Sequence, residues 1–218
     1  MNQEHEYIAV MGTLGSGKTT AARLLSRELN FTLNEETVEE NAFLPRFYQD
    51  MKRWAFHSQT FFLMEKIRQM IATKSQLKTT PVVQDTPIVQ DVFSYAKAQH
   101  ALGNMDDAEW ALYRKIYEEY APMFPKPDLI VFLDTSIAEI ERRIRERGRG
   151  FEQDIPTEYL RLLDSLNREW LAQNNDIPVI VFHSDSLDIS RNKDVQAQFV
   201  SLVRNALHPP ATTDPLAS

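Results

Sequence analysis

The stretch Tyr7-Ile8-Ala9-Val10-Met11-Gly12-Thr13-Leu14-Gly15-Ser16-Gly17-Lys18-Thr19-Thr20 decides the fold of this chain. It opens with an apolar run, residues 7–11, that predicts a β-strand, and residues 17–29 repeat apolar side chains at helical spacing. Between these two elements the pattern Gly-x-x-x-x-Gly-Lys-Thr is complete, with its fixed positions at Gly12, Gly17, Lys18 and Thr19. A strand, a glycine-rich loop and a helix in this order predict a phosphate-binding loop.

The glycines of this loop let the backbone wrap closely around an anion. Loop N–H groups and the first helical turn then point at the phosphates, and the helix dipole favours negative charge there. We expect Lys18 to reach the β- and γ-phosphates of ATP and the hydroxyl of Thr19 to ligate Mg²⁺. The alternative, a glycine-rich turn that binds nothing, is disfavoured by the complete motif in its proper context. The residues expected to hold the nucleotide are Gly12, Thr13, Leu14, Gly15, Ser16, Gly17, Lys18, Thr19 and Thr20.

Composition excludes several classes of protein. The chain has 218 residues, of which 43% are hydrophobic and 25% charged, as in one globular domain with or without a lid. Its net charge of −7 argues against a nucleic-acid binder. The absence of cysteine excludes disulfides and cysteine-based zinc sites. Residues 1–6 lack the apolar core of a signal peptide, and no apolar run reaches membrane-spanning length. We therefore expect a cytoplasmic protein without nucleic-acid or membrane partners.

Further apolar runs alternate with helical patterns along the chain. Five strands alternating with helices predict an α/β fold of three layers, with a parallel five-stranded sheet, right-handed crossovers and helices on both faces. We expect one domain over residues 1–207 and a disordered tail over residues 208–218. The further strands are expected at about 31–33, 81–85, 128–134 and 178–182, and the further helices at about 42–74, 106–121, 136–147, 152–174 and 191–207.

Carboxylates follow two of the predicted strands. An acidic cluster, residues 34–40, lies just past the second strand, and Asp85 ends the third. In open α/β sheets, ligands bind beyond the carboxyl ends of the strands, so both places are candidate sites. We expect Asp85 to help Thr19 hold Mg²⁺. For the acidic cluster two interpretations remain open, a functional carboxylate and a solvated charged surface.

Two other segments carry polar groups in unusual surroundings. Gln59 stands within an aromatic run, residues 54–64, and a flat amide between aromatic walls suits the edge of a nucleobase. Residues 142–150 are rich in arginine and contain Gly148 and Gly150. Arginine suits phosphate because it is always charged and binds in a bidentate fork. This segment is either a mobile lid, at about residues 145–154, or a helix end whose charges complement the helix dipole.

The combined motifs resemble the deoxyribonucleoside kinase family of P-loop kinases, particularly its bacterial deoxyguanosine/deoxyadenosine kinase branch. The resemblance extends from the phosphate-binding loop to about Leu171. It implies that Glu36, in Glu36-Thr37-Val38, is the general base that takes the proton of the 5′-hydroxyl. It also implies a set of substrate contacts, namely Tyr48 for the sugar 3′-hydroxyl with Trp54 six residues later, Gln59 and Asp91 for the base, and Glu152 near the 3′-hydroxyl.

The chain departs from the family pattern at two positions. Lys66 stands where the family has an arginine that works with the acidic residue at position 91. Asp85-Thr86-Pro87 stands where the family often has Asp/Glu-Arg-Ser, so an arginine that holds the 5′ region is missing. We expect the lid arginines, Arg145, Arg147 and Arg149, to supply the missing cation.

The resemblance implies phosphoryl transfer from ATP-Mg²⁺ to the 5′-hydroxyl of a purine deoxynucleoside by a homodimer. One alternative is a nucleoside monophosphate kinase of thymidylate-kinase type, for which residues 40–66 offer several cations. An adjacent carboxylate, however, suits a hydroxyl acceptor better than a phosphate dianion. A third interpretation, motivated by the missing arginine, is a nucleotide-binding module without catalytic activity, since one fold can host many functions.

Overall fold

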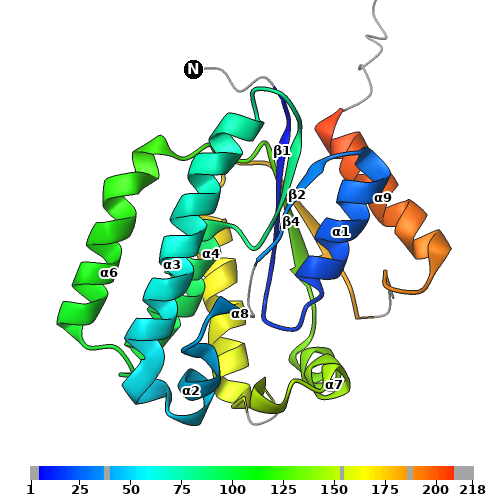
Figure 1. Ribbon diagram of the computed structural model, residues 1–218. Helices are drawn as coiled ribbons and strands as arrows, with labels where there is room; N and C mark the ends of the chain where they lie inside the picture. Colours follow the sequence, from blue (N-terminus) through cyan, green and yellow to red (C-terminus); the bar gives the residue numbers. More distant parts are fainter. Residues whose placement is uncertain (1–4, 37–39, 153–154, 186–188, 209–218) are drawn as a thin grey trace, which may run out of the picture.

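The computed structural model describes residues 5–36, 40–152, 155–185 and 189–208 and has a single parallel sheet at its centre (Figure 1). The strand order is β2-β3-β1-β4-β5, and every neighbouring pair runs parallel. The five-stranded parallel sheet predicted from the sequence is therefore confirmed. The strands are β1 (Tyr7–Gly12), β2 (Thr32–Asn34), β3 (Val82–Asp85), β4 (Leu129–Asp134) and β5 (Val179–His183).

Strand β1 is central, and its side chains are divided between two cores. All six of its residues are buried. Ile8 and Val10 pack in the core beneath α1 (Lys18–Leu29) and α9 (Lys193–Leu207). Ala9 and Met11 point to the opposite face, where they meet Trp170 of α8 (Thr157–Gln173). Successive side chains of a strand point to opposite faces, so this alternation gives the sheet helices on both sides.

A larger helical layer covers the second face, with α3 (Met51–Gln76) and α6 (Asp107–Tyr120) side by side in it (Figure 1). Its other members are α2 (Leu44–Gln49), the joined segments α4 (Ile88–Gln90), a π-helical stretch (Asp91–Ala96) and α5 (Lys97–Ala101), and the 3₁₀ turn Ala121–Met123. None of the helices in the described ranges combines the length and apolarity needed to cross a bilayer.

Two predicted helices have different boundaries. The helix expected over 42–74 is split at Asp50, whose carboxylate accepts a hydrogen bond from the Arg53 N–H and caps α3. The helix expected over 152–174 begins only after Pro156, as α8. A proline ring fixes its own backbone and disfavours the helical conformation in the residue before it, which accounts for the later start.

The carboxyl ends of the strands meet α7 (Ile137–Arg147), which lies near the start of α1 (Figure 1). The phosphate-binding loop packs directly on this helix, because Gly15, at φ +82°, has no side chain to keep Ile140 and Ile144 away. The predicted lid begins within this helix, which ends at Arg147 with Gly148 in the left-handed region. Residues 150–152 then form a 3₁₀ turn, and the last two residues of the predicted lid, 153–154, lie outside the described ranges.

The contact between Gly15 and α7 can be tested with alanine. A Cβ on Gly15 would lie 3.0 Å from the Ile144 side chain and 3.2 Å from that of Ile140. Gly103 also has a positive φ, +70°, but a Cβ there would meet nothing within 4 Å. We expect Gly15→Ala to lower the free energy of unfolding by about 1–3 kcal/mol more than Gly103→Ala, as measured by urea denaturation. Equal losses would show that the loop does not pack tightly on α7.

Candidate active site

The phosphate-binding loop is held in shape by an amide from the neighbouring strand connection. Gly12 lies at φ +156°, and a Cβ there would come within 2.6 Å of the Ser16 hydroxyl and 3.0 Å of the Leu133 carbonyl. The buried Gln90 amide donates to the Gly12 carbonyl at 2.5 Å, and its oxygen accepts from the Gly12 N–H at 3.3 Å. The peptide groups before and after Gly12 are thus both fixed where the chain leaves β1. The sequence analysis did not identify Gln90.

Lys18 lies folded over this loop. Its ammonium donates to the carbonyls of Gly12 at 2.9 Å and Thr13 at 3.3 Å, and to the Tyr95 hydroxyl at 3.3 Å. Burial lowers the pKa of Lys18, while the Asp85 and Glu36 carboxylates act to raise it. A buried cation at the rim of an anion-binding loop is suited to meet phosphate oxygens. Tyr95 is a further site residue that the sequence analysis missed.

Thr19 and Asp85 form a candidate metal site. The Thr19 hydroxyl donates to Asp85 Oδ2 at 2.6 Å, so two oxygen ligands already lie together. Among the described residues there is no group of three or more His, Cys, Asp or Glu side chains placed to hold a metal. The Thr19–Asp85 pair itself suits Mg²⁺, which binds through one or two protein oxygens together with waters and substrate phosphates.

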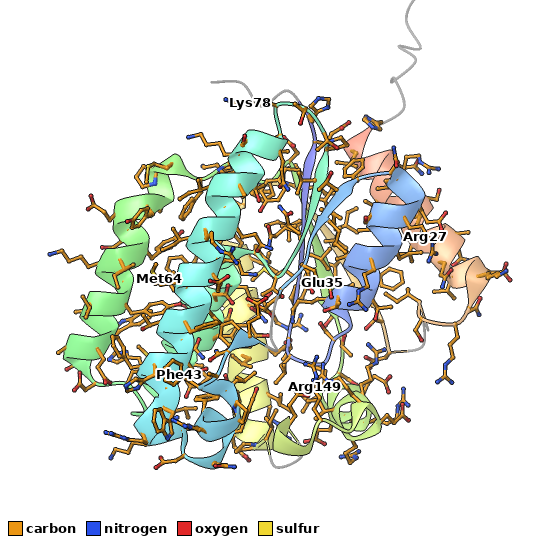
Figure 2. All side chains as sticks on the ribbon, in the orientation of Figure 1. Arg27, Glu35, Phe43, Met64, Lys78 and Arg149 are labelled. Carbon is orange, nitrogen blue, oxygen red and sulfur yellow. The ribbon has the colours of Figure 1, made fainter. Side chains whose placement is uncertain are left out.

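A cavity of about 910 Å³ extends from this loop to the residues just after β2 and to the first half of α3. Figure 2 shows Glu35 and Arg149 on different sides of this region, between α3 and α1. Gly12, Thr13, Ser16 and Asp85 are buried beside it without lining it. The predicted site residues that line the cavity are Leu14, Gly15, Gly17, Lys18, Thr19, Thr20, Glu36, Tyr48, Gln59, Asp91, Arg147, Arg149 and Glu152.

One end of the cavity gathers carboxylates around a buried lysine. The Lys66 ammonium lies 3.5 Å from Glu36 Oε1 and 3.8 Å from Asp91 Oδ2. Burial acts to lower the pKa of Lys66, but the Glu36, Asp91 and Asp85 carboxylates outweigh it, so the pKa is raised. Burial also raises the pKa of Asp91 well above its ordinary value, with Lys66 opposing. Asp91 lines the cavity, and its buried Oδ2 accepts no hydrogen bond from any described residue, which is unusual for a buried polar atom.

Aromatic and amide groups surround the same end. Tyr48 and the buried Gln59 line the cavity, and the Gln59 amide makes no hydrogen bond with the rest of the described chain. Trp54 does not line the cavity. Its ring stacks on Phe43 at 5.9 Å and lies beneath the guanidinium of Arg46 at 5.1 Å. Trp54 therefore packs outside the place predicted for the substrate.

The arginines of α7 and of the segment that follows it point in two directions. Arg147 and Arg149 line the cavity and pair with the buried Glu152. Arg145 is exposed and does not line the cavity, so this structure does not bring it to the site. Arg143, which the sequence analysis did not single out, lines the cavity instead.

Arg143 ties the loop to neighbouring elements. Its guanidinium donates to the Ser16 carbonyl at 2.8 Å, to the Ser184 carbonyl at 2.6 Å and to Glu139 Oε1 at 2.7 Å. Hydrogen bonds from Arg142 and Arg143 lower the pKa of Glu139 to about 2. This ion-paired group joins α7, the end of β5 and the phosphate-binding loop.

Comparison with known proteins assigns the chain to a family. A family model described as deoxynucleoside kinase matches residues 8–208. The chain belongs to the deoxynucleoside kinase family. It is 32% identical to a deoxyguanosine kinase of Bacillus subtilis strain 168 over 193 residues, which cover 86% of this chain and 90% of that protein. A deoxyadenosine/deoxycytidine kinase of the same organism is 28% identical over 208 residues, 94% of each chain.

Solved structures agree with this assignment. A deoxyadenosine kinase from M. mycoides with bound dCTP has a TM-score of 0.77 and 26% identity, over 92% of this chain and 98% of that one. The same enzyme with bound dATP gives a TM-score of 0.76 and 27% identity over the same shares. The predicted P-loop kinase fold is confirmed, and so is the predicted activity of the family, ATP-dependent phosphorylation of deoxynucleosides by a phosphotransferase.

The Glu139 ion pairs of this deoxynucleoside kinase predict a pH effect on stability. The folded-state pKa of about 2 lies below the ordinary value of 4.5, so ionised Glu139 stabilises the folded state above pH 4.5. This contribution is lost as the pH falls from 4.5 to 2. We expect Glu139→Gln to flatten the fall in unfolding free energy across this window, as measured by urea denaturation. The control Glu146→Gln, which removes an exposed partner of Arg142, should keep the wild-type slope. Identical slopes in both variants would contradict this role of Glu139.

Proposed function

We propose that this member of the family transfers the γ-phosphoryl group of ATP, with Mg²⁺, to the 5′-hydroxyl of a purine deoxynucleoside. The observation that carries the proposal is one cavity that joins the phosphate-binding loop to Glu36. Lys18 and Thr19 line its donor end, and Tyr48 and Gln59 line its acceptor end. Phosphoryl transfer depends mainly on positioning and charge stabilisation, which such a shared cavity provides.

The charges at the acceptor end favour a hydroxyl over a phosphate. Glu36 is a partly exposed carboxylate, with 21% of its side chain accessible, and Asp91 lies beside it. Lys66, the cation between them, is buried and already paired with both. The phosphate dianion of a nucleoside monophosphate would meet the Glu36 carboxylate there, which argues against the nucleoside monophosphate kinase alternative.

Gln59 and Asp91 suit the recognition of a base. Both are buried cavity residues, and Gln59 offers a donor and an acceptor side by side. The Asp91 side chain lines the cavity, and its Oδ2 accepts no hydrogen bond from the described residues, which suits an amino group of a purine as the missing partner once a ligand is bound. The deoxyguanosine and deoxyadenosine kinases among the relatives support a purine. We assign Tyr48 and Glu152 to the sugar, since both line the cavity near one another.

The chemistry follows from these positions. Glu36 accepts the proton of the 5′-hydroxyl as the hydroxyl oxygen bonds to the γ-phosphorus and ADP leaves. Lys18 and the loop N–H groups hold the charge of the transferring group, and Arg147 and Arg149 approach from the lid side. When bound through Thr19 and Asp85, Mg²⁺ supplies further neutralisation of phosphate charge. We also propose that the protein acts in nucleotide salvage. We place it in the cytoplasm, where ATP is available.

Replacement of Glu36 tests the assignment of the base. We expect Glu36→Gln to lower kcat for deoxyadenosine or deoxyguanosine by about 10²–10⁴-fold, because the amide cannot take the proton. The dissociation constant of the nucleoside, from calorimetry, should change little. The control Glu35→Gln alters the neighbouring carboxylate, which pairs with Arg23, and should retain kcat. An unchanged kcat in Glu36→Gln would contradict the role of Glu36. A wild-type protein that phosphorylates no deoxynucleoside would contradict the proposed function itself.

We also propose that the protein is a homodimer formed through α3 and α6. Met64 and Ile71 of α3 and Leu112 of α6 are 54%, 53% and 50% exposed, and the two helices contact each other. Figure 2 shows Met64 at the surface of α3. Such an apolar surface is typical of a protein interface.

Sedimentation tests the dimer. We expect the double variant Met64→Lys and Ile71→Lys to sediment as a monomer, because two charges would be buried at the interface. The control Leu202→Lys replaces an exposed side chain of α9, which lies on the other face of the sheet, and should leave the dimer intact. A monomeric wild-type protein, or a double variant that still dimerises, would contradict the proposed interface.

A further inference from the structure

Lys66 contacts Glu36 and the end of β3 as well as Asp91, the residue expected to recognise the base. It comes from the middle of α3, and only 3% of its side chain is exposed. Its ammonium donates to the Thr86 carbonyl at 2.7 Å and to the Asp85 carbonyl at 3.3 Å. It also lies 3.5 Å from Glu36 Oε1. One buried cation therefore joins the end of β3 to the carboxylate beyond β2.

We propose that Lys66 is a positioning residue that holds the Glu36 carboxylate at the acceptor end of the cavity and replaces the arginine missing at Thr86. The inference rests on the proposed function, in which Glu36 is the general base. It differs from the expectation that the lid arginines supply this cation. Lys66 itself is not placed to contact the reacting atoms, because its side chain is directed to main-chain carbonyls beneath the cavity.

The lid arginines are engaged elsewhere. Arg147 and Arg149 pair with Glu152, and Arg145 is exposed and away from the cavity. Within the described ranges, no arginine lies within 4 Å of a Glu36 oxygen, and Lys66 is the cation that does. Among the described residues, Lys66 is therefore the cation next to Glu36, where the sequence led us to expect an arginine of the lid.

The backbone at Thr86 explains why a cation is placed there. Thr86 has φ +58°, a left-handed conformation that a β-branched residue rarely adopts. Such strain persists only where surrounding contacts determine it, and the 2.7 Å bond from Lys66 to the Thr86 carbonyl is one of those contacts. The same ammonium pairs with Glu36 and Asp91. Removing its charge would leave Glu36 without the cation that holds it, so the Glu36 side chain, 21% of which is already accessible, would turn toward solvent.

A double-mutant cycle tests whether Lys66 acts through Glu36. In the wild-type background, we expect Lys66→Gln to lower kcat by about 10²-fold, the order of loss that small misplacement of a reacting group causes. The dissociation constant of the deoxynucleoside should change at least tenfold less than kcat. In the Glu36→Gln background, the same substitution should lower kcat by less than about threefold, because the group it positions is already inactive.

Two further variants separate an effect on the position of Glu36 from a general effect on folding. Lys66→Arg keeps the charge and the donors, so kcat should stay within about tenfold of the wild type. Lys74→Met removes an exposed lysine from the same helix and should leave kcat unchanged. Thermal melting and ATP affinity, measured on every variant, report whether the fold is intact. If Lys66→Gln does not fold, Lys66→Met, which also removes the charge but keeps most of the side-chain stem, replaces it in both backgrounds.

Several results would overturn the inference. These are an unchanged kcat in Lys66→Gln, a loss as large in the Glu36→Gln background as in the wild type, or a loss in Lys66→Arg that matches Lys66→Gln. A wild-type protein without deoxynucleoside kinase activity would instead remove the proposed function on which the inference rests. An active wild type with an active Glu36→Gln variant would point to a different base.

Discussion

The parallel pairing of β1 with β3 is the constraint on which the rest of the site depends. Val10 lies opposite Asp85 in the register, so the phosphate-binding loop and the end of β3 emerge side by side. Thr19, in the first turn of α1, then meets Asp85 at 2.6 Å, and Gln90, just after β3, closes on Gly12. A shift of one residue in this register would send the Asp85 carboxylate to the other face of the sheet and separate the pair.

Buried charge is the second feature of the site, and it is organised in pairs. An isolated charge in a protein interior is costly, whereas a paired and hydrogen-bonded one is tolerated. Lys18 is satisfied by loop carbonyls, and Lys66 by the carbonyls of Asp85 and Thr86 at the end of β3 and by the side chains of Glu36 and Asp91. In the proposed mechanism, the cation at the donor end meets phosphate and the carboxylate at the acceptor end meets a hydroxyl. This difference in charge between the two ends of one cavity is the basis on which we propose a nucleoside acceptor rather than a nucleotide acceptor.

Sequence patterns predicted those parts of the site that depend only on residues close together in the chain. The phosphate-binding loop follows from fixed spacing, and Asp85 follows from its place at the end of an apolar strand. Gln90 and Tyr95 were missed because only the packing of the π-helical stretch and its neighbours against the loop brings them to Gly12 and Lys18. Trp54 was expected at the substrate from its six-residue spacing to Tyr48, but its ring packs on Phe43 outside the cavity, a contact that the spacing does not reveal.

The choice among the arginines of α7 could have been made from the sequence. Residues of a helix are rotated by about 100° each, so positions three or four apart share a face. Ile140 and Ile144 mark the buried face, and Arg143 and Arg147 lie beside it. Arg145 lies about 140° from Ile140 and faces solvent. The replacement of the missing arginine by Lys66 could not be found this way, because it depends on contacts between β3 and a distant helix.

The most direct test of the central claim is a comparison of acceptors. Product formation from ATP-Mg²⁺ would be measured by chromatography with deoxyadenosine, deoxyguanosine, the matching ribonucleosides and the matching monophosphates, with Lys18→Ala as the control. The account predicts that a purine deoxynucleoside yields its 5′-monophosphate, that monophosphates are poor acceptors, and that the Lys18 variant is inactive. Phosphorylation of monophosphates alone would contradict the assignment of the acceptor end, and ATP binding without any transfer would contradict the assignment of a catalytic function.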